Sequence, residues 1–205
     1  MKTLHIRLRA LGVFRSLLND PAIAALCVFL EQRETASAVS AYSDFVAAFY
    51  RTEKRTLAGY VQSLVGQDEN AYIRMIGRGV EPWPELEANV RAELQILQEV
   101  ADLTPEKLRQ GMQWDGYLPG FAVKQIDLTQ TYQARCRNIS KYGYGIYSKY
   151  HMFYVNADNK IVPVRNPDVT RLSSLVDYER EQQIILDNTV ALLEGRPAAN
   201  ILLTG

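Results

Sequence analysis

The residues with the clearest chemical meaning stand at the end of the chain, over positions 192–205. They have the pattern of a helix end, a break at Gly195 and Pro197, a short apolar strand over residues 201–203, and a final glycine. The same order leads into the phosphate-binding loop G-x-x-x-x-G-K-[ST] of nucleoside triphosphatases. Gly205 would be the first glycine of that loop. We therefore expect the front part of an ATPase, without the lysine and hydroxyl that hold phosphate and magnesium.

No other residues have the spacing of a catalytic or metal site. His5 and His151 are the only histidines, and neither has a second ligand at a metal-binding spacing. No serine or cysteine has a nearby base and a third partner. Cys27 and Cys136 lack metal spacing and indicate a reducing compartment rather than a disulfide framework. We assign no catalytic and no metal-binding residue.

The composition excludes several classes of partner. The 205 residues include 23 acidic and 23 basic side chains, so no overall positive field attracts nucleic acid. The longest apolar run, residues 22–30, is too short to span a bilayer, and no signal-peptide core follows the N-terminus. We expect a cytoplasmic protein with no membrane association, and the balanced charge disfavours a nucleic-acid partner.

The first part, residues 1–112, has the spacing of successive helices and is predicted to form a helical N-terminal domain. Asp20 and Pro21 form a helix start signal, and a second long helical segment is predicted over residues 40–65. Pro82 and Pro84 break the chain before the cleanest amphipathic stripe. That stripe consists of Leu86, Val90, Leu94, Leu97 and Ala101.

Residues 113–165 are expected to form an α+β connector. A helix is predicted over residues 128–139, followed by an aromatic strand over 141–155 and a return strand over 161–164. Residues 156–159 have the composition of the turn between them. The fold class is therefore mainly α with a small β-hairpin (α+β).

Residues 166–205 are expected to begin an incomplete AAA-type α/β core. A helix should start at about Tyr178 and end at Gly195. Residues 201–203 should form a strand that is buried in the intact core. In this chain the strand lacks its neighbours, so we expect it to be frayed, docked on the helical domain or paired with a second copy of the chain. The side chains expected to face inward from this helix are Ile185, Leu186, Val190 and Leu193.

From about residue 141 onward the chain resembles an uncharacterised bacterial family of predicted AAA-type P-loop ATPases, catalogued as a domain of unknown function. Four pieces carry the resemblance in order: the glycine/aromatic turn 143–147, the linker 162–168, the Leu-x-x-Leu box 172–179, and the lead-in to the Walker A loop at 188–205. The first 140 residues fit only as the family's variable helical N-terminal region.

The resemblance implies that the complete family protein binds ATP and Mg, and that this sequence by itself holds neither. It implies that in the complete protein Val176 and Tyr178 line the adenine pocket and that Gly205 opens the phosphate loop. In this chain by itself we expect Val176 and Tyr178 to cap the last helix against its neighbours instead. The box has Asp177 where the family usually has a glycine that lets the backbone lie close to adenine. Walker A lysine and Walker B acid are both missing from the sequence, so ATP hydrolysis is not expected from it, although the family resembles ATPases.

Two functions remain open. The first is a non-catalytic regulatory or partner-docking region of an ATPase, whose partner is another protein, the rest of the ATPase core or a second copy of the chain. The alternative is a stand-alone helical interaction module that binds single-stranded nucleic acid through a tyrosine-rich hairpin. Lys141 and Lys149 accompany the tyrosines concerned, although we favour a sheet packed on the bundle. These tyrosines are Tyr142, Tyr144, Tyr147, Tyr150 and Tyr154.

Overall fold

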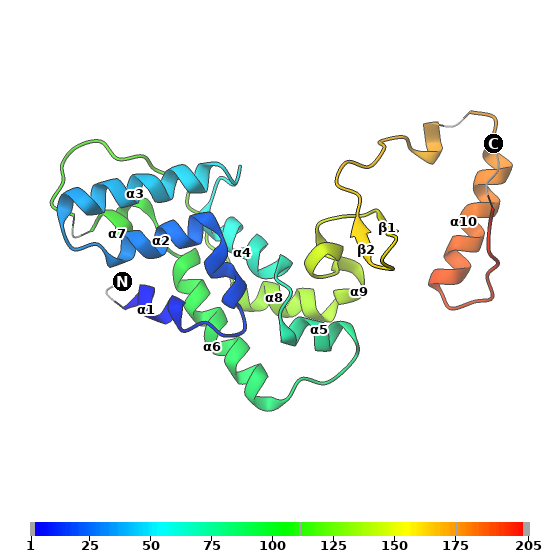
Figure 1. Cartoon of the computed structure of the whole chain (residues 1–205), viewed down its shortest axis with the longest axis horizontal. Helices are drawn as coiled ribbons and strands as arrows, with labels where there is room; N and C mark the ends of the chain where they lie inside the picture. Colours follow the sequence, from blue (N-terminus) through cyan, green and yellow to red (C-terminus); the bar gives the residue numbers. More distant parts are fainter. Residues whose placement is uncertain (1–2, 111, 175, 203–205) are drawn as a thin grey trace. The chain divides into compact units, whose positions relative to one another are not determined.

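The computed structural model describes residues 3–110, 112–174 and 176–202 (Figure 1). The chain divides into two compact units, Met1–Pro163 (unit 1) and Val164–Gly205 (unit 2). Residues 113–163 therefore share a unit with the helices that precede them. Each unit is described by itself below.

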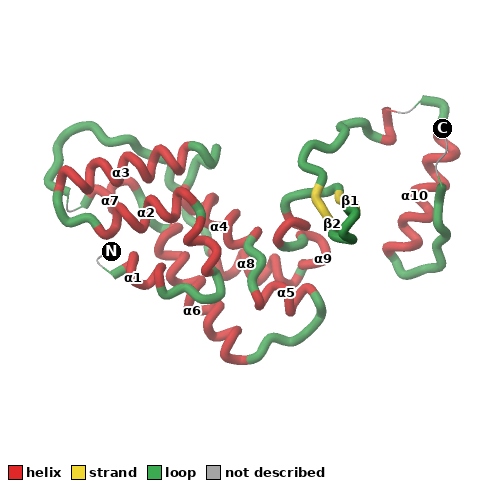
Figure 2. The backbone as a smooth tube through the Cα atoms, in the orientation of Figure 1, coloured by secondary structure: helices red, strands yellow, loops and turns green. Residues whose placement is uncertain are grey.

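Unit 1 is a helical bundle followed by a small antiparallel hairpin, as the tube in Figure 2 shows. Its elements in chain order are α1 (Leu4–Arg9), η1 (Arg15–Asn19), α2 (Pro21–Glu31), α3 (Thr35–Tyr50), α4 (Leu57–Gln67), α5 (Ala71–Gly77), α6 (Pro84–Ala101), α7 (Pro105–Arg109), α8 (Leu128–Arg137), α9 (Ile139–Tyr142), η2 (Gly145–Ser148), β1 (Phe153–Val155) and β2 (Ile161–Pro163). In the hairpin, Phe153 pairs with Pro163 and Val155 with Ile161. A mainly α fold with one small hairpin is thereby confirmed.

Short polar side chains fix where several helices begin. Asp20 accepts hydrogen bonds from the amides of Ala22 and Ile23, both at 3.0 Å, so α2 starts at the predicted signal. Equivalent side-chain caps precede four other helices, at Thr56, Asn70, Thr104 and Asp127. Each cap satisfies an amide that the first helical turn leaves without an intrahelical partner.

One cluster of buried apolar side chains forms the core of unit 1. The helices α2 and α3 lie side by side (Figure 1), and α6 contacts both α4 and α8. All five members of the predicted α6 stripe are buried, which confirms that prediction. Aromatic rings fill much of the space beside α3, where Phe121 packs edge-on against Phe45 and Phe49, with ring centroids 6.1 and 5.3 Å apart.

The segment 112–127 contains no helix in its described residues but is fastened to the bundle. The Arg109 guanidinium donates to the carbonyl oxygens of Leu118 and Pro119, at 2.6 and 3.0 Å. The Tyr42 hydroxyl donates to the same Pro119 carbonyl at 2.7 Å. These bonds hold the segment against α3 and α7, which lets Phe121 reach the core.

The single helix predicted over residues 40–65 is wrong, because α3 ends at Tyr50 and α4 starts at Leu57. Glu53 adopts the left-handed conformation between them, with φ 59°. Thr56 then starts α4, since its hydroxyl accepts a hydrogen bond from the Gly59 amide at 3.1 Å. The apolar spacing continues through the break, so periodicity alone joined two helices into one.

The aromatic strand predicted over residues 141–155 is also mostly wrong. Only Phe153–Val155 is a strand, and the earlier residues form the helical turns α9 and η2. Gly143 and Gly145 separate these turns with φ 61° and 54°, a conformation that favours glycine. Glycine here breaks the extended run that the β-branched and aromatic composition favoured.

Unit 2 contains η3 (Leu172–Ser174) and α10 (Glu179–Leu193) among its described residues. α10 ends as predicted at Gly195, which has φ 67° and whose amide donates to the Leu192 carbonyl at 3.1 Å. Ile201 and Leu202 form no strand, and residue 203 lies outside the described part. Across the described residues of both units, no helix combines the length and apolar character needed to cross a bilayer.

Candidate functional site

Two of the residues expected to hold nucleotide, Val176 and Tyr178, are exposed side chains of unit 2. Val176 is 74% exposed and Tyr178 is 57% exposed, and Tyr178 stands at the N-cap position of α10. Asp177 between them adopts φ 68°, so the position where the resembling family has glycine does have a glycine-like backbone. Gly205 lies outside the described residues. The adenine contacts therefore stay a prediction.

The chain after α10 turns back and is held to the helix by one side chain. The Asn188 amide donates to the Ala199 carbonyl and accepts from the Ala199 amide, both at 2.8 Å. The predicted inward face is largely wrong, since Leu193 is 81% exposed and Ile185 is only half-buried. Ala191 is the one buried residue of α10.

The tyrosines after α8 do not form one flat platform. Tyr144 packs against the core, and its ring meets that of Tyr147 edge-on at 6.3 Å. Tyr147 also contacts Phe153, with centroids 5.1 Å apart. Two other tyrosines, Tyr142 and Tyr154, are about half exposed but lie on different elements, α9 and β1. Tyr144 and Tyr147 thus pack against neighbouring rings, although Tyr147 is still 46% exposed.

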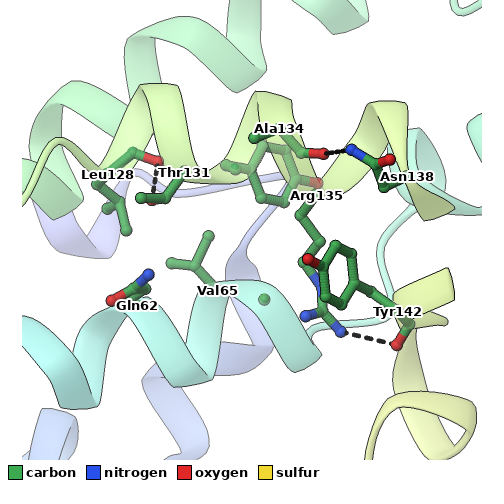
Figure 3. Close-up of a pocket in the computed structure, with 10 residues that line it drawn as sticks. Gln62, Val65, Leu128, Thr131, Ala134, Arg135, Asn138 and Tyr142 are labelled. Carbon is green, nitrogen blue, oxygen red and sulfur yellow. Dashed lines mark hydrogen bonds between the residues drawn. The ribbon is translucent and has the colours of Figure 1, made fainter.

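A better-defined site lies in unit 1, between α4, α8 and α9 (Figure 3). It is a pocket of about 350 Å³, here named the Arg135 pocket. Its lining residues are Gln62, Val65, Gly66, Leu128, Thr131, Tyr132, Ala134, Arg135, Asn138 and Tyr142. The walls are partly apolar, with polar groups at a few positions, which is the usual character of a small-molecule site.

Arg135 brings the only charge into this pocket lining. Its side chain leaves α8 and lies beside the Tyr142 ring, with the guanidinium carbon 5.4 Å from the ring centroid (Figure 3). One terminal nitrogen, Nη2, donates to the carbonyl oxygens of Tyr142 and Gly143, both at 3.1 Å. These carbonyls end α9, where a cation is favoured. Burial lowers the pKa of Arg135 from its usual value, yet arginine stays protonated at neutral pH.

A second hollow of about 270 Å³ adjoins the first and shares Gln62, Gly66 and Arg135 with it. Its remaining lining residues are uncharged as well. Within the described residues, no carboxylate forms an ion pair with Arg135. Gly66 lets the arginine lie close to α4, because a Cβ there would meet the Arg135 Cδ at 3.4 Å. The positive charge thus sits between two hollows without an acidic partner.

Cys136 follows this arginine on α8, and burial raises its pKa to about 11. Burial also raises the pKa of Cys27. Since the thiolate is the reactive form, we expect both thiols to react with Ellman's reagent at pH 8 at least about tenfold more slowly in the folded chain than in urea. Equal rates in the two conditions would contradict the shielding of these side chains.

The Arg135 pocket was not predicted from the sequence. Its residues come from three helices, and α9 was expected to be part of a strand. One weak sequence signal pointed to the pocket. Arg135 lies on the predicted helix 128–139, and its neighbours one turn earlier, Thr131 and Tyr132, are not acids that could pair with its charge. A set of three or more His, Cys, Asp or Glu side chains able to hold a metal does not occur among the described residues either.

Comparisons with known proteins identify one region of the chain. No curated protein and no solved structure matched it. One family model matches, in the C-terminal part of the chain where the sequence resembles a known family. The match covers less than a third of the chain, and the family has no stated activity. It includes the hairpin and all of unit 2. Residues 148–205 match the family described as "Protein of unknown function (DUF815)".

Proposed function

We propose that this chain is a non-catalytic regulatory or partner-docking region of an AAA-type ATP-binding protein. In this proposal the helical unit 1 meets a protein partner, and unit 2 leads toward a nucleotide-binding core that supplies the ATP and Mg chemistry. Val176 and Tyr178 would contact adenine only once that core is present. The family match over residues 148–205 supports the placement of this lead-in, although the family itself has no stated activity.

The observation that carries the proposal is the exposure of apolar side chains in unit 2. Val169, Leu192, Leu193 and Leu202 are between 67% and 91% exposed. A single buried alanine gives α10 almost no core of its own. Several strongly exposed apolar side chains on so small a unit suit a surface that another structure covers. An ATPase core would provide that cover, because such a core packs its helices on a sheet.

The proposal predicts how the chain behaves toward nucleotide. Calorimetry with Mg–ATP is expected to show no binding tighter than about 1 mM, because the loop lysine and the metal-binding acid are not in this sequence. The codons after Gly205 are expected to encode Gly-x-Gly-Lys-Ser/Thr in frame. Micromolar binding of Mg–ATP by this chain, or an immediate stop codon, would contradict the proposal.

The alternative is the stand-alone module that binds single-stranded nucleic acid. Tyr142, Tyr147 and Tyr154 are 45%, 46% and 53% exposed, which favours it, but the rings of Tyr144 and Tyr147 are engaged with neighbouring rings. Fluorescence anisotropy with a single-stranded oligonucleotide at two salt concentrations separates the two functions. Binding that weakens as salt rises would favour the alternative, because phosphate contacts release counterions.

A further inference from the structure

We propose that the Arg135 pocket binds a small monocarboxylate with an apolar body, whose carboxylate pairs with the Arg135 guanidinium. This site lies wholly within unit 1. The inference goes beyond the docking function and does not depend on it, since it concerns residues outside the family match.

The charge in the pocket requires an anion. None of the residues that line the two hollows is acidic, and Arg135 brings the only cation to both. The carbonyls of Tyr142 and Gly143 satisfy Nη2 but carry only partial charges. Nη2 is committed to these carbonyls and Nε is buried, so Nη1 is the nitrogen left to donate a charge-assisted hydrogen bond to a carboxylate.

The size and walls of the pocket indicate the rest of the ligand. A volume of about 350 Å³ lies at the lower end of the range for small-molecule sites. Val65, Leu128 and Tyr132 contribute apolar groups to its lining. Gln62 lines both hollows and its side chain makes no hydrogen bond with another described residue, so the side-chain amide is free to meet a polar ligand atom. An apolar body with one charged end suits this arrangement.

The number of charges favours a carboxylate over a phosphate. A phosphate monoester carries about 1.5 to 2 negative charges at neutral pH, and one arginine would leave part of that charge unpaired. A carboxylate carries one charge and matches one guanidinium. Inorganic phosphate is therefore the appropriate competing probe.

A purely structural role for Arg135 is the competing explanation, and Arg109 shows what such a role looks like. Arg109 also donates to two carbonyls, lies over the Tyr42 ring at 6.0 Å and has a buried Nε without a partner among the described residues. It does not line the Arg135 pocket. Carbonyl capping and a buried Nε are thus not evidence for a ligand. The inference depends on the pocket and on the missing acid, and Arg109 supplies a matched control.

The test uses the whole chain and defined probes. Benzoate, hexanoate and 3-phenylpropionate are titrated into ¹⁵N-labelled protein up to about 20 mM, beside their neutral amides and inorganic phosphate. Fragments of this size reach dissociation constants on the order of 1 mM. At least one acid is expected to shift the amide signals of Gln62, Thr131 and Asn138 in a saturable way, whereas its amide binds at least about tenfold more weakly.

Three variants separate charge, shape and folding. Arg135→Gln keeps a donor for the α9 carbonyls but removes the charge, and is expected to weaken acid binding about tenfold to a hundredfold. Ala134→Leu fills the pocket and keeps the Arg135 side chain, and it is expected to abolish binding. This variant tests the site even if Arg135→Gln does not fold. Arg109→Gln is expected to leave binding unchanged. Far-UV circular dichroism checks that each variant keeps its helices.

Four results would overturn the proposal. These are the absence of shifts at the pocket with every acid, equal binding of acids and amides, unchanged binding in Ala134→Leu or in a folded Arg135→Gln, and phosphate binding as tight as that of the acids. Without shifts at the pocket, there is no ligand site there. Equal binding of acids and amides, or unchanged binding in the variants, would show that the assigned contacts are wrong. Phosphate binding as tight as that of the acids would show that the ligand is not specifically a carboxylate.

Discussion

Replacing Glu93 with alanine is expected to lower the free energy of unfolding of unit 1 by about 2 to 4 kcal/mol, the largest loss we expect from one polar side chain. Glu93 is 8% exposed and lies on the core-facing side of α6. Its two carboxylate oxygens accept four hydrogen bonds of 2.8 to 3.0 Å from the amides of Gly12, Val13 and Phe14. Phe14 is fully buried, so without Glu93 its amide loses its partner where water cannot replace it.

Urea unfolding followed by circular dichroism at the helix band measures this loss. Glu93→Gln keeps one acceptor oxygen and should fall between alanine and the natural residue. Glu99→Gln is the matched control on the same helix, because Glu99 pairs with Arg7 at the surface and is about half exposed. Surface pairs contribute about 0 to 1 kcal/mol. Equal losses for Glu93→Ala and Glu99→Gln would show that the amide contacts do not stabilise the fold.

Replacing Asp20 with alanine is expected to cost about 2 to 3 kcal/mol, the second largest effect. One part is the loss of the α2 cap, worth about 1 kcal/mol. The other part is the Tyr60 hydroxyl, which donates to the second Asp20 oxygen and is 6% exposed. Burial and this hydrogen bond raise the pKa of Tyr60 well above its usual value, so the hydroxyl remains a donor. Without Asp20 that donor is left inside without its acceptor.

The same urea measurement separates the two parts. Asp127→Ala removes a comparable cap, from an exposed residue that accepts from the Gln130 amide at 2.8 Å, and should cost only about 1 kcal/mol. In Tyr60→Phe protein, Asp20→Ala should fall to a similar cost. A loss for Asp20→Ala no larger than that for Asp127→Ala would mean that the tyrosine contact contributes nothing.

Local signals in the sequence predicted a good part of the fold. Asp20 with Pro21, the α6 stripe and Gly195 each act within a few residues, and all three lie where they were expected. The turn at 156–159 also formed, with the Asn156 side chain accepting from the Asp158 and Lys160 amides. The prediction failed where one residue's backbone changed direction in a short polar stretch between two apolar segments, as at Glu53.

The candidate site depended on contacts between distant segments, so the sequence predicted little of it. Glu93 stands between Val90 and Leu97 on the buried face of α6. An acid among buried apolar positions indicates that its carboxylate has hydrogen-bond donors inside the fold, but the sequence does not say which donors these are. The Arg135 pocket needs α4, α8 and α9 to meet, and no local pattern specifies that meeting. The family pattern lay at the end of the chain, where residues 148–205 match the family model.

The Glu93 contacts also affect how the protein is made on the ribosome. They join residues 79 to 81 positions apart, so the Gly12–Phe14 amides emerge long before their acceptor. At 5 to 20 residues per second, that delay is roughly 4 to 16 seconds. During this interval α1 lacks its contacts with α6, so its apolar residues Leu4 and Leu8 are less completely covered than in the finished fold. The N-terminal helix is therefore expected to settle late in synthesis, once α6 has left the exit tunnel.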